Sequence, residues 1–263
     1  KLNMLEPFSN SAFILNTAGV LFNSIGNHVP EDLSTAPFSR SLKIKKIFDF
    51  LDEKSLWLLG YEGYVRYLLL GQAHKNNSLD SRGFPEGGYY IIRHKGLSLH
   101  FDCGELGYLS LAGHGHADSL SFTLSVNGRH IFVDPGTYLY HSDNKWRDYF
   151  RGTASHNTIR IDRVDQSEAL GPFLWGYKAR ACLKYWTLNG DSDKVAGYHT
   201  GYARLKDPVT HSREIVLDKL NREVVITDSI SSKDGHYVEQ FFHLHPDCLL
   251  KKAGDYLFEI SNK

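Results

Sequence analysis

The chain has 263 residues, of which 41% are hydrophobic and 23% charged, so it can bury a core and is neither disordered nor fibrous. Thirty basic residues balance thirty acidic ones, which excludes a surface that coats nucleic acid in general. Aromatic residues make up 13%, a bias that favours β-structure and is compatible with stacking on sugar rings. No apolar run approaches the roughly 18 residues that a membrane span needs.

The cysteines and the N-terminus say little about the compartment. Cys103, Cys182 and Cys248 are widely separated, and they form neither a disulfide framework nor a CxxC metal site. The N-terminal residues show no signal-peptide pattern. Because the chain starts abruptly at Lys1, we expect it to be part of a longer protein.

Residues 1–80 are predicted to be a helical domain. Three helices are expected: one after Ser9, one starting near Ser39, and one over residues 52–70. The first has its apolar residues at helical spacing, namely Phe13, Ile14, Ala18, Leu21 and Phe22. The stretch from Gly71 to Gly88 is rich in Asn, Gly and Ser and is the predicted boundary.

From Tyr89 onward the hydrophobic period changes to two, which is typical of β-strands. Apolar and small polar residues alternate over residues 119–126, and Asn127-Gly128 then gives a strong hairpin signal. A two-residue turn predicts that Leu124 pairs with Ile131 and that Phe122 pairs with Val133. Asp134 would then lie opposite Ser121, on the polar face of the hairpin.

Several more strands are expected before the end of the chain. Their predicted ranges are 158–162, 179–186, 213–218, 223–230 and 237–245. Many antiparallel strands joined by short turns favour a β-sandwich, here over residues 84–263. The predicted fold class is therefore mainly β with a helical N-terminal part.

Histidine and aspartate residues from three segments suggest a metal site. His114, His116 and Asp118 precede the hairpin, Asp134 follows it, and His156 precedes the next strand. Three protein ligands of these types are the usual composition of a zinc site that keeps one open position. Two alternatives stay open: the histidines form a hydrogen-bonded network without metal, and Asp118 only caps a turn.

The metal hypothesis makes a demand on the backbone near His116. If the strand before Ser121 ran straight, His116 would lie about 17 Å from Ser121, at roughly 3.3–3.4 Å per residue. It can reach Asp134 and His156 only if residues 114–118 fold back as a loop. Gly113 and Gly115 would permit such a loop.

A second cluster of chemically active residues follows Pro135. Tyr138 and Tyr140 are candidates for proton transfer, since a neighbouring cation can lower the pKa of tyrosine. Arg147 and Arg151 could clamp a carboxylate, and Trp146 offers a stacking surface for substrate. The alternative is an aromatic loop that packs against the helices.

Several motifs together resemble the heparinase II/III family of polysaccharide lyases. They run in order from Phe84-Pro85-Glu86-Gly87-Gly88-Tyr89-Tyr90 to the HxHxD segment at His114, the DPG segment at Asp134 and the HNT segment at His156. Asp165-Gln166-Ser167-Glu168 and Gln240-Phe241-Phe242-His243-Leu244-His245-Pro246 extend the resemblance to residue 246. Residues 1–80 resemble the last helices of the family's toroid more weakly.

The resemblance implies the end of an incomplete α/α toroid followed by an antiparallel β-sandwich. It implies β-elimination on a polysaccharide that contains uronic acid. The family's metal position falls on His116, Asp134 and His156 and implies a structural zinc. The family's active-site histidine matches His114, and Tyr140 is the best match for its tyrosine, with Tyr138 second. The substrate implied is an acidic polysaccharide, and the location implied is periplasmic or secreted.

The resemblance also implies that part of the machinery lies elsewhere. The family's other catalytic residues, an Asn or His and a Tyr, come from toroid helices that would precede Lys1, so the chain alone is expected to be nearly inactive. The sandwich is also expected to be cut short at Lys263. Two other hypotheses remain: a carbohydrate-binding or scaffolding module with a structural zinc, and a zinc hydrolase that uses a metal-bound water.

Overall fold

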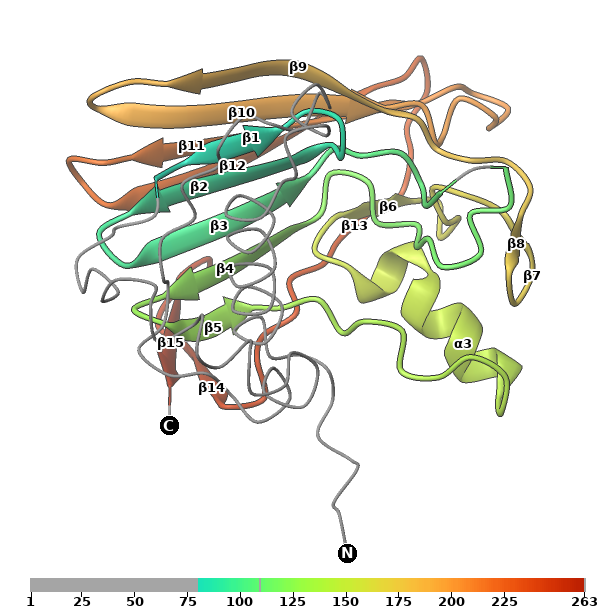
Figure 1. Ribbon diagram of the computed structural model, residues 1–263, viewed down its shortest axis with the longest axis horizontal. Coiled ribbons are helices and arrows are strands. Elements are labelled where there is room, and N and C mark those ends of the chain that lie inside the picture. Colours follow the sequence, from blue (N-terminus) through green and yellow to red (C-terminus); the bar gives the residue numbers. More distant parts are fainter. Residues whose placement is uncertain (1–79, 109, 263) are drawn as a thin grey trace, which may run out of the picture. The chain divides into compact units, whose positions relative to one another are not determined.

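The computed structural model describes residues 80–108 and 110–262, and the chain forms two compact units, Lys1–Ser78 and Leu79–Lys263. The three predicted helices lie outside the described residues. The described part is dominated by antiparallel β-strands, with one α-helix, α3 (Asn144–Arg151) (Figure 1). None of its helices is long and apolar enough to cross a membrane.

The first sheet has five strands in the order β1-β2-β3-β4-β5. Their bounds are Arg82–Phe84, Tyr89–His94, Leu97–Asp102, Phe122–Val126 and Arg129–Phe132. The turn between β2 and β3 is Lys95-Gly96, whose positive φ angles of 42° and 83° match a tight hairpin turn. Alternate residues of these two strands are buried, as the period of two predicts.

The second sheet has four strands in the order β12-β11-β10-β9. The strands, from β9 to β12, are Ala181–Leu188, Ser192–His199, Thr210–Asp218 and Glu223–Ser231. Strand β11 buries every second residue, and two of these, His211 and Arg213, are polar. The polar half of this buried face lies toward the start of β11, and the apolar half, with Ile215 and Leu217, lies toward its end.

The apolar core is built from both sheets, which confirms the β-sandwich. Ile92, Leu99 and Phe101 of the first sheet belong to one buried cluster with Val195 and Ile215 of the second. Burying each side chain of this size contributes about 1.5–3 kcal/mol of transfer free energy. This cluster therefore fixes the two sheets against each other.

Smaller elements complete the described part. β6 (Ile159–Ile161) pairs with β13 (Val238–Gln240), β7 (Ala169–Gly171) with β8 (Leu174–Trp175), and β14 (Cys248–Lys252) with β15 (Phe258–Asn262). The strands predicted near residues 158–162, 179–186, 213–218 and 223–230 are confirmed. The strand predicted over 237–245 is shorter, and its later part pairs with β5 in an isolated bridge between Phe132 and Leu244.

The β4–β5 hairpin turns at Asn127-Gly128 as predicted, but the predicted register is wrong. Val126 pairs with Arg129 and Ser125 with His130, and then the register shifts so that Leu124 pairs with Phe132. The extra residue is a β-bulge, which turns Phe132 rather than Ile131 toward the core. The Phe132 ring packs 5.7 Å from the Phe122 ring, and this contact explains the shift.

Helix α3 lies in a segment that the sequence analysis treated as a loop. Asp143 caps it, because its carboxylate accepts the backbone N–H groups of Lys145 and Trp146. The helix is only 8 residues long and has a mixed polar and aromatic sequence. Such a short segment gives little helical periodicity, although the capping residue itself was readable.

Candidate functional site

The segment from His114 to Asp118 folds back as a loop, as the metal hypothesis requires. Leu120 has a φ of 61°, which ends the straight path that would have kept His116 distant. The Ala117 N–H donates to the carbonyl of Arg151 at the end of α3. A Cβ on Gly115 would lie 2.7 Å from Leu106, so glycine is needed for close packing there. The His116 ring consequently lies 5.2 Å from the His156 ring.

His156 lies between a short 3-10 turn (Thr153–Ser155) and β6, and it is completely buried. Its Nδ1 is 2.6 Å from Oδ2 of Asp134, which links the two predicted residues directly. Since Asp134 is an acceptor, Nδ1 carries the hydrogen and Nε2 presents its lone pair in the neutral ring. Nε2 is buried and has no hydrogen-bond partner in the described part of the chain. A buried nitrogen of this kind is ready to accept a cation.

The potential ligand atoms at this site come from His116, Asp118 and His156. One nitrogen or oxygen from each of these three residues lies within 4.8 Å of the others. Asp118 had been considered a turn cap, whereas here it stands among the potential ligands. Asp134, which the sequence analysis placed in the ligand set, contacts the same site through His156 Nδ1. A His, His, carboxylate set fits zinc.

The carboxylates around His156 favour positive charge at its ring, either a proton or a bound cation. Burial alone would lower the pKa of His156, but its bond to Asp134 and the charges of Asp118 and Asp102 outweigh burial and raise it. Burial raises the pKa of Asp118 to about 6 and that of Asp102 to about 7. Burial, together with the charge of His156, lowers the pKa of His116 to about 4, so its ring is neutral at pH 7 and can bind a metal.

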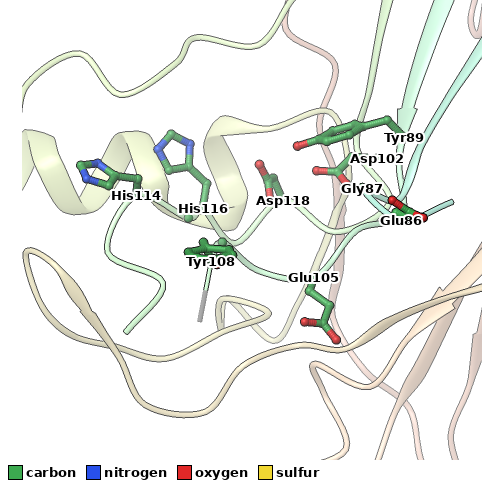
Figure 2. Close-up of a pocket in the computed structure, with 11 residues that line it drawn as sticks. Glu86, Gly87, Tyr89, Asp102, Glu105, Tyr108, His114, His116 and Asp118 are labelled. Atoms are coloured by element: carbon green, nitrogen blue, oxygen red, sulfur yellow. The ribbon is translucent and has the colours of Figure 1, made fainter. Parts of the chain in front are cut away.

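A pocket of about 590 Å³ opens beside these residues (Figure 2). Figure 2 shows His114 and His116 on one side, Asp118 in the middle, and Tyr89 with Asp102 on the other side. Tyr89 and Asp102 are paired residues at the ends of β2 and β3. The remaining lining residues are Glu86, Gly87, Glu105, Gly107, Tyr108 and Gly115.

His114 and Tyr140 lie next to each other, in agreement with their joint selection from the sequence. Their rings are 5.6 Å apart and perpendicular, and both side chains are exposed. Tyr140 also stacks on Phe173 at 6.0 Å. Tyr138 lies differently: its ring contacts Trp146 and Phe150, and 69% of the residue is exposed. The structure therefore groups His114 with Tyr140 rather than with Tyr138.

Arg147 and Arg151, which the sequence suggested as a clamp for a substrate carboxylate, are buried. Arg147 donates to the carbonyls of Gly113 and Pro172, and Arg151 pairs with Asp148. Their charges are covered by aromatic rings, Tyr140 and Phe173 over Arg147 and Trp175 over Arg151. In this conformation they support the loop that carries His114 and do not reach solvent. Trp146 is 45% exposed and remains available for stacking.

The sequence analysis missed the acidic side of the pocket. Asp102 ends a strand, Tyr89 begins its partner, and Glu105 follows shortly after. The available signal was the segment around Glu86, which carried the family resemblance, but nothing in its spacing indicated that it would meet Asp118. That meeting depends on the pairing of β2 with β3.

Two buried residues hold the site's backbone in place. The Asn157 side chain donates to the carbonyls of Phe122 and Val133 and accepts the His243 N–H. Arg213 on β11 donates to the carbonyls of Leu120 and Asn157, at 2.8 and 2.5 Å. Both residues therefore lie directly behind the segments that carry Asp118 and His156.

The fold and the site define an antiparallel β-sandwich with a histidine- and carboxylate-lined pocket at one end. Residues 76–262 match the family described as "Heparinase II/III-like, C-terminal". The chain belongs to this family.

Two curated relatives are heparin-sulfate lyases from Bacteroides. The protein from Bacteroides thetaiotaomicron is 27% identical over 167 residues, and the one from Bacteroides stercoris is 24% identical over 165 residues. Each alignment covers 59% of this chain and 22% of the relative. The chain therefore spans about a fifth of the length of these relatives.

Solved structures show the same fold. Heparinase III is similar with a TM-score of 0.55 and 20% identity, over 78% of this chain and 34% of that chain. The heparan sulfate lyase HepC from Pedobacter heparinus is similar with a TM-score of 0.57 and 16% identity, over 90% of this chain and 31% of that one. The matched fold includes the sandwich described above.

Proposed function

We propose that this chain is the C-terminal part of a polysaccharide lyase that cleaves uronic-acid-containing polysaccharide by β-elimination. The observation that carries the proposal is the pairing of exposed His114 and Tyr140 at the pocket, beside the partly buried His116 and Asp118 and the buried His156. The heparin-sulfate lyase relatives support the same reaction class. The proposal includes three further points. Residues 1–80 form a helical domain, this domain is the end of an α/α toroid in the longer protein, and the protein is periplasmic or secreted.

The reaction needs three groups around one sugar. The substrate carboxylate is neutralised, a base removes the proton on the adjacent carbon, and the C–H electrons form a carbon–carbon double bond. The bond to the glycosidic oxygen breaks, and an acid protonates that oxygen. In our proposal His114 faces the carboxylate, and Tyr140 transfers a proton at its phenolic oxygen. The remaining groups are supplied by the longer protein.

A zinc ion fits the residues beside the pocket. The orphaned Nε2 of buried His156, the neutral ring of His116 and a carboxylate would hold it. When bound, the metal would supply a structural link between loop 114–118 and β6. In this arrangement Asp134 orients His156 by accepting its Nδ1–H, as carboxylates do for metal-bound histidines.

The test uses a longer protein that carries this chain together with its upstream helices. It is incubated with heparan sulfate, alginate and hyaluronan, and new unsaturated uronate ends are measured by their ultraviolet absorbance. We expect product from at least one substrate and a loss of about 10²–10⁴-fold in rate for His114→Ala and Tyr140→Phe. His141→Ala, an exposed neighbouring change, is the control. Saturated products, or full activity of His114→Ala, would refute the proposal.

A carbohydrate-binding module is the second candidate, favoured by the exposed aromatic residues. Tyr138, Trp146 and Tyr149 are 69%, 45% and 49% exposed and contact one another through Trp146. Such rings stack on sugars without any chemistry. Binding without product in the same assay, lost in Trp146→Ala and kept in His114→Ala, would favour this function over the lyase.

A further inference from the structure

The pocket beside His114 lacks the positive charge that an acidic polysaccharide requires. Among the residues that the structure describes, its lining includes four acidic residues and no lysine or arginine. The nearby Arg147 and Arg151 are buried and already engaged. A polyanion held only here would meet Glu86, Asp102, Glu105 and Asp118, so cationic contacts have to come from an adjoining surface.

A second pocket of about 510 Å³ adjoins the first and offers these cations. Glu105 lines both pockets, so they are neighbours on one surface. The second pocket contains Lys178 and Arg180, two residues apart in an extended segment that leads into β9. Its other lining residues are Leu106, Gly176, Tyr177, Ala179 and Thr200.

The floor of this second pocket is well ordered by hydrogen bonds. Buried Ala179 donates its N–H to the Ser167 hydroxyl, which fixes the backbone between Lys178 and Arg180, and all three residues line the pocket. The Thr200 N–H donates to the Arg180 carbonyl, and the Arg180 N–H donates to the Thr200 hydroxyl. The Tyr177 hydroxyl donates to the Thr200 carbonyl. The cations therefore project from a fixed base.

Arg180 has its charged group available for a ligand. Within the described part of the chain its guanidinium makes no hydrogen bond or ion pair, and the residue is exposed. Lys178 is partly engaged, since its ammonium donates to the Ser110 carbonyl. A guanidinium can hold a carboxylate or a sulfate through two parallel hydrogen bonds.

We propose that the pocket lined by Tyr177, Lys178 and Arg180 is a subsite for an acidic sugar next to the one at His114. Arg180 binds the carboxylate or sulfate of that sugar, and Lys178 adds charge. The inference rests on the proposed function, because it takes the His114 pocket to be the place where the polysaccharide lies. It adds the recognition of a neighbouring sugar along the chain.

The test measures binding by calorimetry, with the 263-residue chain and defined oligosaccharides. The probes are a heparan sulfate hexasaccharide, the unsulfated hexasaccharide of the same backbone, and a disaccharide. Arg180→Ala is compared with Arg129→Ala, which removes the same charge from an exposed hairpin residue whose side chain makes no hydrogen bond or ion pair within the described part of the chain. Both changes are on the surface, so both variants are expected to fold.

We expect Arg180→Ala to weaken hexasaccharide binding about tenfold, and Arg129→Ala to change it less than about twofold. Disaccharide binding should be equal in all three proteins, because a short ligand occupies one pocket. An effect confined to the sulfated hexasaccharide would identify sulfate as the group bound, and an equal effect on both would identify carboxylate. Equal affinities of the two variants for both hexasaccharides would overturn the inference.

The same measurement separates the subsite from the lyase proposal. If the longer protein forms no unsaturated ends but the Arg180 effect persists, the subsite stands and the lyase chemistry fails. If unsaturated ends form while Arg180→Ala binds like Arg129→Ala, the lyase stands and the subsite fails. Absence of any binding by the wild-type chain would overturn the subsite as well.

Discussion

Two histidine–aspartate clusters in this sandwich differ in whether their hydrogen bonds are complete. The closed cluster contains His199, His211, Arg213 and Asp228 of the four-stranded sheet. The open cluster contains His116, Asp118, Asp134 and His156, beside the pocket. Both place a buried histidine next to a carboxylate, but only the first has a partner for every ring nitrogen.

In the closed cluster the protons can be followed from group to group. The Gly201 N–H donates to Nδ1 of His199, so Nε2 of His199 carries the hydrogen and donates to Nδ1 of His211. Nε2 of His211 then donates to Asp228. The same carboxylate accepts two hydrogen bonds from Arg213, from Nε at 2.7 Å and from Nη2 at 2.9 Å. Both rings are neutral in this scheme, in agreement with their lowered pKa values, which burial causes.

In the open cluster the series of hydrogen bonds ends at His156, whose Nε2 has no partner in the described part of the chain. Its Nδ1 is bound to Asp134, but its Nε2 faces Asp118 and His116 without a hydrogen bond in the described structure. A complete buried network stabilises a fold, whereas an incomplete one is costly unless a ligand completes it. The comparison therefore predicts that the first cluster stabilises the fold and that the second binds a ligand.

The largest effect is expected for Arg213→Met in the closed cluster. The change leaves Asp228 without its bidentate partner and the carbonyls of Leu120 and Asn157 without a donor. Breaking a buried pair of this kind costs about 3–5 kcal/mol of unfolding free energy. Urea unfolding of the purified chain measures it, with exposed Arg129→Met as control. A loss below 1 kcal/mol would contradict the assignment of stability to this cluster.

Metal content should separate the two clusters next. We expect about one zinc per chain by mass spectrometry, lost in His116→Ala and His156→Ala. His211→Ala should keep its zinc but unfold at a lower urea concentration. If His211→Ala lost the metal as readily as His156→Ala, or if the wild type purified without chelators held none, the distinction would fail.

The two carboxylates of the open cluster are expected to differ in effect. Asp118→Asn should remove a charged ligand, while Asp134→Asn should weaken zinc binding by about 10–100-fold through the orientation of His156. Competition with a zinc-binding dye measures both affinities, and the wild-type chain is the reference. A larger loss for Asp134→Asn than for Asp118→Asn would assign the direct bond to Asp134, in the way the family resemblance implies.

The smallest expected effect is a pH dependence from the closed cluster. Because burial holds the pKa of His199 well below its usual value near 6.5, the unfolded chain binds more protons than the folded one below about pH 6.5. Stability should therefore fall as the pH drops below that value. In His199→Asn, whose amide oxygen can still accept the Gly201 N–H, the fall should be smaller. Urea unfolding of both proteins at pH 7.5 and 5.5 tests this. An equal loss of unfolding free energy in the wild type and in His199→Asn would refute it.

The fold was predictable where local signals decide it, and less so where tertiary packing does. The Asn127-Gly128 turn and most strands follow from alternation and turn residues. The register of β5 does not, because the bulge depends on Phe132 packing against Phe122 and Phe242. A one-residue shift of this kind leaves no trace in the alternation of a four-residue strand.

The candidate site shows a similar division. The approach of His116 to His156 and of His156 to Asp134 was anticipated, although the hairpin register used to argue it was wrong. Arg147 and Arg151 were proposed from the sequence as a carboxylate clamp, and only the structure shows the carbonyls and aromatic rings that surround them in the interior. The role of these arginines therefore depends on contacts far apart in sequence.

The hydrogen bonds of Asn157 also have a consequence for the timescale of local opening. Its amide joins the end of β5, the start of β4 and the segment at His243, so none of the three can separate without breaking bonds to the same side chain. The amide protons of Val133 and His243 should accordingly exchange with deuterium at similar, slow rates, as one cooperative unit. The backbone that holds the adjacent His156 should therefore open only together with this unit.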